Sequence, residues 1–252
     1  SPENRAAYQK VTFYRGMELA TDGKHQEALA LFKKSLAEQR TPRITARATF
    51  WKAETEYNLE QFNEALISYK QFLGMGEAKT TPEYKNIHYN IAYAYFKQKE
   101  YEQAAKHFAD YVAVAKDDKV RLNDALLRLG DSNFVTGKYW PAMEAYNKAI
   151  DMKGIDADYA LFQKGISYGF VGRNEKKIED LTKFAQSYPK SKYADDALYE
   201  LGNTYVTEKQ TDKAIQTYDK LITDYKSSTY VSKAIMRQAL IYYNAEKDDQ
   251  AL

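Results

Sequence analysis

The stretch SYPKSKYADDALYELGNTYVTEKQTDKAIQTYDKLITDY, residues 187–225, holds one complete structural unit of this 252-residue chain. Leu198 and Leu201 lie close to Gly202 at the spacing of one helix face, and a second apolar face begins near Ile215. The polar segment VTEKQTD separates the two faces. This pattern predicts two antiparallel helices that touch at the small residue Gly202.

The small residue recurs along the whole chain with a period of about 37 residues, which indicates an array of helical repeats. It is glycine or alanine in seven units: Gly16, Ala53, Ala92, Gly130, Gly165, Gly202 and Ala239. Twelve residues later comes alanine, with one exception: Ala28, Ala65, Ala104, Ala142, Lys177, Ala214 and Ala251. Four residues further comes a large side chain: Phe32, Tyr69, Phe108, Tyr146, Leu181 and Tyr218. These columns predict an all-α solenoid of about thirteen or fourteen antiparallel helices in a right-handed superhelix, without strands.

The sequence of small residue, alanine and aromatic residue resembles the tetratricopeptide repeat (TPR) family over nearly the whole chain. A narrower resemblance lies in YPKSKYADDALYELGNTY and DYKSSTYVSKAIMRQALIYY. They are similar to the long-period repeats of bacterial envelope proteins, such as the periplasmic partner of the Tol-Pal system and the TPR lipoprotein of the outer-membrane barrel assembly machine. The segment AYQKVTFYRGMELA resembles multi-repeat TPR proteins of Bacteroidetes. The resemblance implies a periplasmic or outer-membrane location, with the cytoplasm as the alternative.

We expect a single solenoid made of six full repeats and a shortened seventh. Their predicted boundaries are residues 4–40, 41–78, 81–116, 117–153, 156–190 and 193–228, followed by 229–252. Because the chain ends at the alanine column of the seventh unit, we expect a fragment of a longer protein. Ile235, Ala239 and Tyr242 would then face an incomplete second helix, and end-to-end self-association could cover them.

Local signals predict where several helices begin. Thr41-Pro42 and Thr81-Pro82 each open a first helix, with threonine as the cap and proline in the first turn. Asp117-Asp118 begins the fourth unit, where the acidic charge complements the helix dipole. The insertion GMGEAKT, residues 74–80, is predicted to be a plain loop. The fifth unit carries Lys177 in the alanine column and three glycines in its first helix, so we expect looser packing there.

Composition excludes several classes of protein. Hydrophobic residues make up 44% and aromatic residues 14% of the chain, which is too apolar for a disordered segment. The 37 basic and 35 acidic residues leave a net charge of +2, and no basic cluster indicates nucleic-acid binding. There is no cysteine, and no apolar run approaches the roughly 20 residues of a membrane span.

No pattern of residues indicates catalysis, a cofactor or a metal. His25, His88 and His107 fall in a turn, a first helix and a second helix, and none has another metal ligand four residues away. We therefore predict isolated histidines, no metal site and no enzyme. Glycine-containing segments lack the spacing of a nucleotide-binding loop.

Two functions remain open from the sequence. The first is an interaction scaffold, in which a concave face lined by first helices binds a peptide or protein segment. The alternative is a structural spacer without a ligand of its own. For the scaffold, the candidate groove consists of an aromatic stripe with two polar residues: Phe13, Phe50, Trp51, Tyr57, Tyr89, Asn90, Tyr93, Phe96, Arg128 and Phe134. Each ring could instead fill the space between neighbouring helices.

Overall fold

The computed structural model describes residues 2–251 of the chain, and the side chains of residues 2–246. Every regular element within these residues is helical, which confirms the predicted all-α repeat of hairpins. The chain forms two compact units, Ser1–Thr136 and Gly137–Leu252. No helix of the described part is long and apolar enough to span a membrane.

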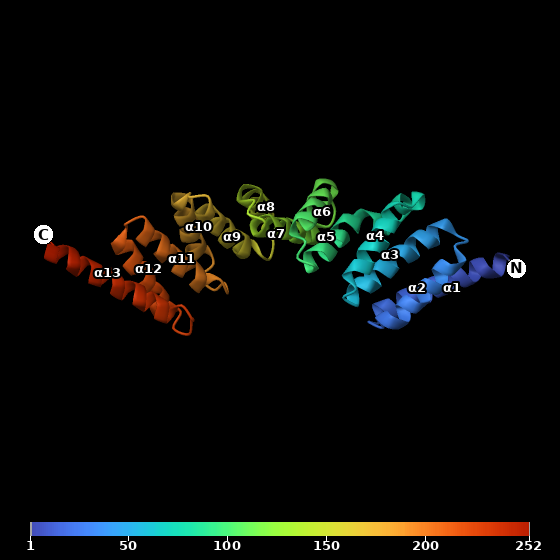
Figure 1. The fold of residues 1–252 in the computed structure, drawn as a ribbon, viewed down its shortest axis with the longest axis horizontal. Coiled ribbons are helices and arrows are strands. Elements are labelled where there is room, and N and C mark those ends of the chain that lie inside the picture. The colour runs from blue at the N-terminus through green and yellow to red at the C-terminus, as the bar shows by residue number, and fades with distance from the viewer. Residues whose placement is uncertain (1, 252) are drawn as a thin grey trace. The chain divides into compact units, whose positions relative to one another are not determined.

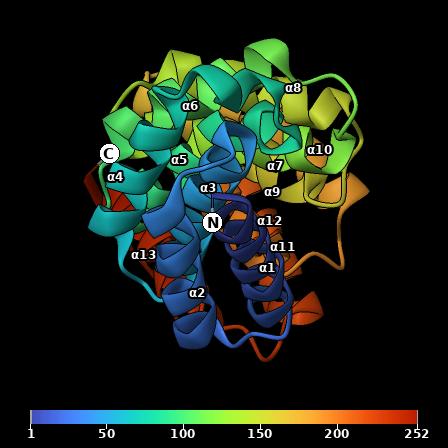
Figure 2. The same ribbon diagram turned by 90° about the vertical axis from the view of Figure 1, so that its right-hand side faces the viewer.

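Unit 1 is a series of antiparallel helices joined by short turns. Figure 2 shows that α1 and α2 run side by side. Its elements are α1 (Pro2–Thr21), α2 (His25–Glu38), α3 (Pro42–Asn58), α4 (Phe62–Leu73), the 3-10 helices η1 (Gly76–Thr80) and η2 (Pro82–Asn86), α5 (Ile87–Lys97), α6 (Tyr101–Val114) and α7 (Lys119–Val135).

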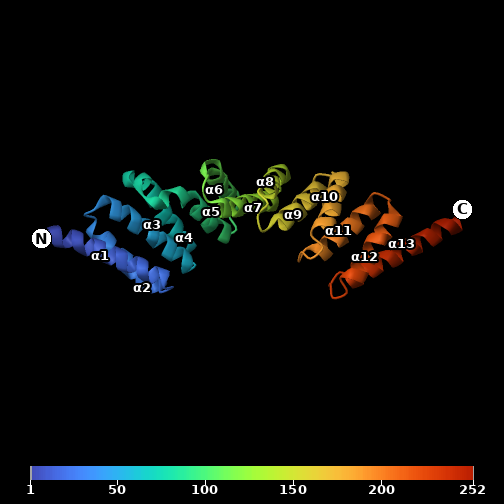
Figure 3. The ribbon, with the colours of Figure 1, turned by 180° about the vertical axis from the view of Figure 1, so that it is seen from behind.

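Unit 2 repeats the same hairpin from α9 onward, and the chain order of its helices can be followed in Figure 1 and from behind in Figure 3. Its helices are α8 (Tyr139–Asp151), α9 (Ala157–Phe170), α10 (Asn174–Ser187), α11 (Ala194–Thr207), α12 (Thr211–Asp224) and α13 (Val231–Ala251).

The three sequence columns meet where the two helices of a hairpin touch. A Cβ atom added to Gly16 would lie 2.8 Å from Cε1 of Phe32, and one added to Gly202 would lie 2.8 Å from Cδ1 of Tyr218. The large residue of the column is almost completely buried in every unit: Phe32, Tyr69, Phe108, Tyr146, Leu181 and Tyr218. The small residue is therefore needed because the ring of the second helix lies directly on the backbone of the first.

The hairpin turns use a further column, seven residues after the small residue. Its members have φ between 57° and 76°: Gly23, Glu60, Lys99, Gly137, Gly172 and Lys209. Glycine adopts this left-handed region without steric cost, whereas the three charged residues adopt it at a cost of about 1–2 kcal/mol each.

The helix caps differ from the two predicted at threonine. Asp118, which was expected only to complement the helix dipole, does cap α7, because its side chain accepts a hydrogen bond of 2.9 Å from the backbone N–H of Arg121. Thr41 makes no such bond, although proline follows it in the first turn. The backbone N–H groups of Arg40 and Thr41 instead donate to Oε1 of the buried Gln9, at 3.0 and 2.8 Å. The acceptor for these two N–H groups is therefore a side chain of the first helix of the preceding repeat.

The insertion is not a plain loop. Residues 76–80 form η1, which buries Ala78, and residues 82–86 form η2, so that α5 begins at Ile87. The hydroxyl of Thr81 does not cap η2 but donates to the backbone carbonyl of Ala78 at 2.6 Å.

The fifth unit compensates for its unusual residues. Nζ of Lys177 forms an ion pair of 2.7 Å with Glu200, and its aliphatic stem lies against Gly169, where a Cβ would be 3.0 Å from Cδ of the lysine. Leu181 is completely buried. Phe184 is also completely buried, whereas Phe170 is 60% exposed.

The seventh unit differs from the prediction. We expected Ala251 to lie in a second helix, but α13 continues without a turn from Val231 to Ala251. Glu246 occupies the turn column and keeps helical backbone, so the chain does not reverse there. The large apolar residues exposed on α13 are Ile235, Met236, Leu240, Tyr242 and Tyr243.

Candidate functional site

A pocket of about 650 Å³ lies in unit 1 between the first helices α3 and α5, and η2 and α7 contribute to its wall. This size is typical of ligand-binding pockets. Its lining is Arg47, Phe50, Trp51, Glu54, Tyr57, Tyr69, Pro82, Glu83, Asn86, Tyr89, Asn90, Tyr93 and Arg121. We call this cavity the α3–α5 pocket.

Helical periodicity brings these side chains together. On α3, Trp51 and Glu54 follow Arg47 at spacings of four and three residues, which places them along one helix face. On α5, Tyr89 and Tyr93 are four residues apart and form an edge-to-face pair with ring centroids 5.0 Å apart. One face of α3 and one face of α5 therefore border the pocket, and each carries aromatic residues.

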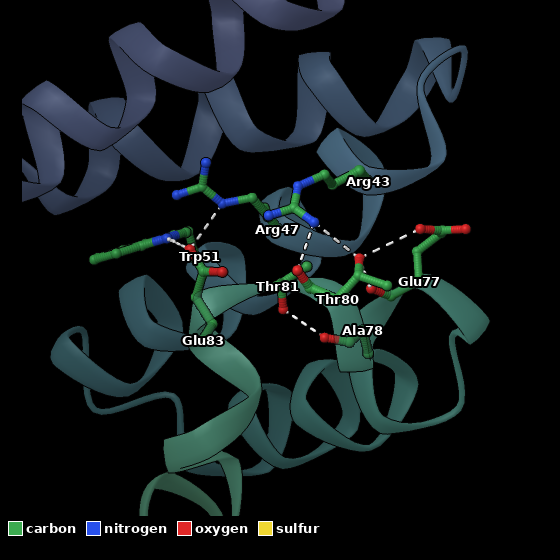
Figure 4. A network of polar contacts seen from close by, with 8 residues as sticks. All are labelled: Arg43, Arg47, Trp51, Glu77, Ala78, Thr80, Thr81 and Glu83. Atoms are coloured by element: carbon green, nitrogen blue, oxygen red, sulfur yellow. Dashed lines mark hydrogen bonds and ion pairs between the residues drawn. The ribbon is translucent and has the colours of Figure 1, made fainter. Parts of the chain in front are cut away.

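The 3-10 helix η2, which follows the insertion, supplies an acidic residue to the pocket. Oε1 of the buried Glu83 accepts hydrogen bonds from Nε of Arg47 at 2.9 Å and from Nε1 of Trp51 at 3.0 Å (Figure 4). Nearby, Nη1 of Arg43 donates to the hydroxyl oxygen of Thr80 at 3.0 Å, which ties η1 to α3. The two 3-10 helices are thus fixed to the preceding first helix by two arginines.

Glu54 lies at the centre of the polar wall. Its Oε1 accepts hydrogen bonds from the hydroxyl of Tyr69 and, at 2.5 Å, from Nδ2 of Asn90. Both donors are neutral, and among the described residues no basic side chain forms an ion pair with Glu54. Burial raises the pKa of this carboxyl group, and the two hydrogen bonds only partly oppose it.

Two further acceptors beside the pocket have no hydrogen-bond partner within the described part of the chain. They are Oε2 of Glu83 and Oδ1 of Asn90, and both atoms are buried. Unpaired buried acceptors are rare, and each raises the free energy of the folded chain by about 1–3 kcal/mol. The polar wall therefore has an excess of acceptors over donors.

The tyrosines of α5 are oriented by the next first helix. Oδ2 of Asp124 accepts hydrogen bonds from the hydroxyls of Tyr89 and Tyr93, at 2.8 and 2.5 Å. Burial raises the pKa of both phenols, and Asp124 adds to this. The guanidinium of Arg121 lies 5.2 Å from the ring centre of Tyr89 and is paired with Asp118 at 2.9 Å.

The structure brings six of the ten predicted groove residues to the α3–α5 pocket: Phe50, Trp51, Tyr57, Tyr89, Asn90 and Tyr93. Phe13 was wrongly included, because its ring is completely buried against Phe32 and cannot contact a partner. Phe96 packs against Tyr101 and Phe108.

The remaining two predicted residues, Arg128 and Phe134, lie on α7 and do not line this pocket. Arg128 forms an ion pair of 2.5 Å with Asp131, and its guanidinium lies 6.0 Å from the ring centre of Phe96.

The sequence reasoning missed the charged residues of the pocket. Glu54 stands three residues after Trp51 and three before Tyr57, so the aromatic spacing itself could have identified it. Glu83 could not be placed in the same way, because it lies in η2, after the insertion, and outside the repeat columns.

Two histidines expected to be isolated lie together on the other side of α5. Nδ1 of His88 is 3.1 Å from Nδ1 of His107, and Oδ2 of Asp110 is 3.8 Å from Nδ1 of His88. Desolvation, with a contribution from His88, lowers the pKa of His107 to about 4. The prediction failed because it looked only for ligands on one helix, whereas this cluster joins α5 to α6.

Comparisons with known proteins agree with the repeated hairpins. Two family models described as tetratricopeptide repeat match the chain, one at residues 13–79 and 52–121 and the other at residues 159–191 and 196–228. Together the matches extend over more than half of the sequence. The chain belongs to the tetratricopeptide repeat family.

Solved structures of other proteins have a similar fold. The apo form of RapI has 14% sequence identity and a TM-score of 0.71, with 96% of this chain and 71% of that chain covered. The C-terminal part of a TPR repeat-containing protein from Cytophaga hutchinsonii has 16% identity and a TM-score of 0.68, with 95% and 90% covered. YrrB, described as a TPR protein with an unusual peptide-binding site, has 18% identity and a TM-score of 0.62, with 81% and 97% covered. No curated protein sequence matches this chain.

Proposed function

We propose that this TPR chain is a non-catalytic protein-interaction scaffold, and that its α3–α5 pocket binds an extended partner segment through one lysine or arginine side chain. The observation that carries the proposal is Glu54, a carboxyl group in the pocket wall whose two hydrogen-bond donors among the described residues are both neutral and which the charge of Arg121 reaches without an ion pair. A cation from the partner would complete its pairing and offset the cost of its burial.

The aromatic walls fit the stem of such a side chain. Trp51, Tyr57, Tyr89 and Tyr93 are half-buried, so each presents part of its ring to the pocket. Lysine and arginine bury their methylene groups against apolar surface while the charged head reaches a polar partner, and a cation over an aromatic face gains about 0.5–2 kcal/mol. The half-exposed rings and the acceptor wall thus favour the same ligand.

An acidic ligand would fit less well. The two arginines of the pocket are already engaged, Arg47 with Glu83 and Arg121 with Asp118. The atoms beside the pocket that lack a partner in the described part of the chain are acceptors, which need a donor. The fold similarity to YrrB, whose structure is described as having a peptide-binding site, is compatible with this use of the fold.

The test is a positional library of fluorescein-labelled octapeptides measured against the purified chain. We expect bound peptides to share a lysine or arginine, whose replacement by glutamine weakens binding at least about 10-fold, because breaking a buried charge pair costs about 2–5 kcal/mol. Glu54→Gln should produce the same loss, and Trp51→Ala and Tyr93→Ala should also weaken binding.

The matched control is Glu64→Gln on the exposed face of α4, which should leave affinity unchanged. Peptides that bind equally well to the wild type and to Glu54→Gln would refute the basic specificity. Selection of no peptide at all would refute the scaffold and favour a spacer.

We further propose that the chain works in a bacterial cell envelope, in the periplasm or at the outer membrane. The long repeat period and the aromatic-Pro-x-Ser form at residues 188–191 support this location. Fractionation of cells that express the complete native gene product tests it, since recovery in the cytoplasmic fraction would contradict the proposal.

A further inference from the structure

The histidine pair on α5 and α6 has a geometry that restricts its chemistry. The ring centroids of His88 and His107 are 5.4 Å apart, their planes differ by 21°, and their Nδ1 atoms are 3.1 Å apart. Each Nδ1 atom lies close to the centre of its own ring. With the ring centres 5.4 Å apart, the two Nδ1 atoms come within 3.1 Å only when they point at each other. In the neutral pair one Nδ1 carries a proton and the other offers a lone pair.

Asp110 adds a third donor atom at the same place. It lies three residues after His107 on the same face of α6, and the donor atoms of the three residues all lie within 4.8 Å of one another. The surrounding elements hold the group in place, because the ring of His107 is nearly parallel to that of Tyr95, with centroids 5.7 Å apart. The cluster therefore joins the two helices of one hairpin.

We propose that His88, His107 and Asp110 form a binding site for a divalent transition metal ion, with Zn²⁺ as the preferred class. Metal–ligand bonds of about 2.0–2.1 Å place the donors of a tetrahedral site about 3.3 Å apart. Two of the three separations, 3.1 and 3.8 Å, are within about half an ångström of this value, and the third is at most 4.8 Å. The metal would replace the proton between the two rings, and a modest rotation of each ring would turn its lone pair toward the ion.

The site is accessible from solvent. The side chains of His88 and Asp110 are 33% and 46% exposed, so that an ion can enter and water can complete its coordination. The two residues also line a cavity of about 760 Å³, whose other charged residues are two aspartates and two lysines: Asp117, Asp118, Lys85 and Lys116. Imidazole ligands favour zinc and its transition-metal neighbours over Mg²⁺ and Ca²⁺, which prefer oxygen.

A metal ion here would cross-link α5 and α6 and stabilise the hairpin. A ligand that binds only the folded chain raises the free energy of unfolding. The increase grows with the logarithm of the ratio of the free ion concentration to Kd, once the concentration exceeds Kd. This role does not depend on peptide binding in the α3–α5 pocket.

The test uses the complete chain, freed of metal with a chelator and titrated with Zn²⁺ by calorimetry. We expect one equivalent of zinc to bind and to raise Tm, and one equivalent of Co²⁺ to give the visible absorption of a tetrahedral or five-coordinate site. Asp110→Asn should weaken zinc binding at least about 10-fold, and His88→Gln or His107→Gln should remove it.

His25→Gln on α2 and Asp117→Asn beside the site serve as controls and should bind zinc like the wild type within about 3-fold. Circular dichroism of each variant checks that it folds. Because Asp110 is half-exposed, its amide variant remains informative even if a histidine variant unfolds. Absence of a saturable zinc equivalent in the wild type, or equal zinc affinity in Asp110→Asn and the wild type, would overturn the proposal.

Discussion

Replacing Gly202 by alanine tests the contact that defines the repeat. The added Cβ would lie 2.8 Å from Cδ1 and 2.9 Å from Cζ of Tyr218, closer than carbon atoms pack. The ring cannot swing into solvent, because Tyr218 is completely buried and its hydroxyl donates to Oδ1 of Asn203 at 2.8 Å. Alanine should therefore displace the ring and separate α11 from α12.

Two opposing effects determine how much Gly202→Ala changes the free energy of unfolding. Alanine in a helix interior is favoured over glycine by about 0.5–1 kcal/mol, whereas overpacking a core costs about 1–3 kcal/mol. The net expectation is a destabilisation between zero and about 2.5 kcal/mol. Gly76→Ala is the control, since its Cβ would meet no atom within 4 Å and its φ is not positive, so it should stabilise by about 0.4–1 kcal/mol.

A double-mutant cycle isolates the steric contribution. Tyr218→Leu copies the pairing of the fifth unit, where Gly165 faces Leu181, and leaves more room for a Cβ at residue 202. We expect Gly202→Ala to be less destabilising in this background by about 1 kcal/mol, which is a typical coupling between residues in contact.

The assay is amide hydrogen exchange of α11 and α12, with urea unfolding in parallel, because repeat arrays need not unfold in one step. If Gly202→Ala is as stabilising as Gly76→Ala, or has the same effect in both backgrounds, the small residue is not at the helix contact and our reasoning is wrong.

Two further predictions concern Glu54 and α13. Since burial raises the pKa of Glu54, its neutral form stabilises the fold, and that stabilisation is lost as pH rises through the folded-state pKa. Glu54→Gln, which keeps an acceptor for Tyr69 and Asn90, should therefore raise Tm near pH 7 and have little effect near pH 4, and an equal effect at both values would contradict this. On α13, the exposed apolar side chains predict concentration-dependent self-association in sedimentation velocity, which Leu240→Glu should reduce. The control Ile155→Glu, at a residue that is 94% exposed, should not, and a wild type that stays monomeric at all concentrations would refute the prediction.

The repeat could be predicted because each column has one physical cause that every unit shares. Gly16 and Gly202 occupy the same column since a buried ring lies on each, and the spacing of twelve and four residues follows from the geometry of the hairpin. The cap of α3 could not be predicted, because it depends on Gln9, which lies in another repeat and reaches the turn through the stacking of hairpins. The sequence columns describe contacts within one repeat, whereas the contact of Gln9 with Thr41 joins two neighbouring repeats.

The sequence predicted only part of the candidate site, and the reason is related. The aromatic residues of α3 and α5 follow helical spacing, but spacing does not distinguish a ring at a pocket from a ring in the core. Phe13 and Phe50 stand in the same column and are both buried, yet Phe50 lines the α3–α5 pocket and Phe13 does not. The hairpin of Phe50 is followed by the insertion and by η2, whose Pro82 and Glu83 line the pocket, whereas α2 and α3 are joined without 3-10 helices.

The irregular connection after α4 therefore supplies part of the pocket wall. This connection, residues 74–86, gives the longest separation between small residues, from Ala53 to Ala92, and contains η1 and η2. Glu83 of η2 contacts Arg47 and Trp51, and its second oxygen remains without a partner in the described part of the chain. Oδ1 of Asn90 on α5 also lacks a partner there, so that two buried acceptors lie beside one aromatic pocket. Such unsatisfied groups raise the free energy of the folded chain, and a ligand that donates to them would recover part of that cost.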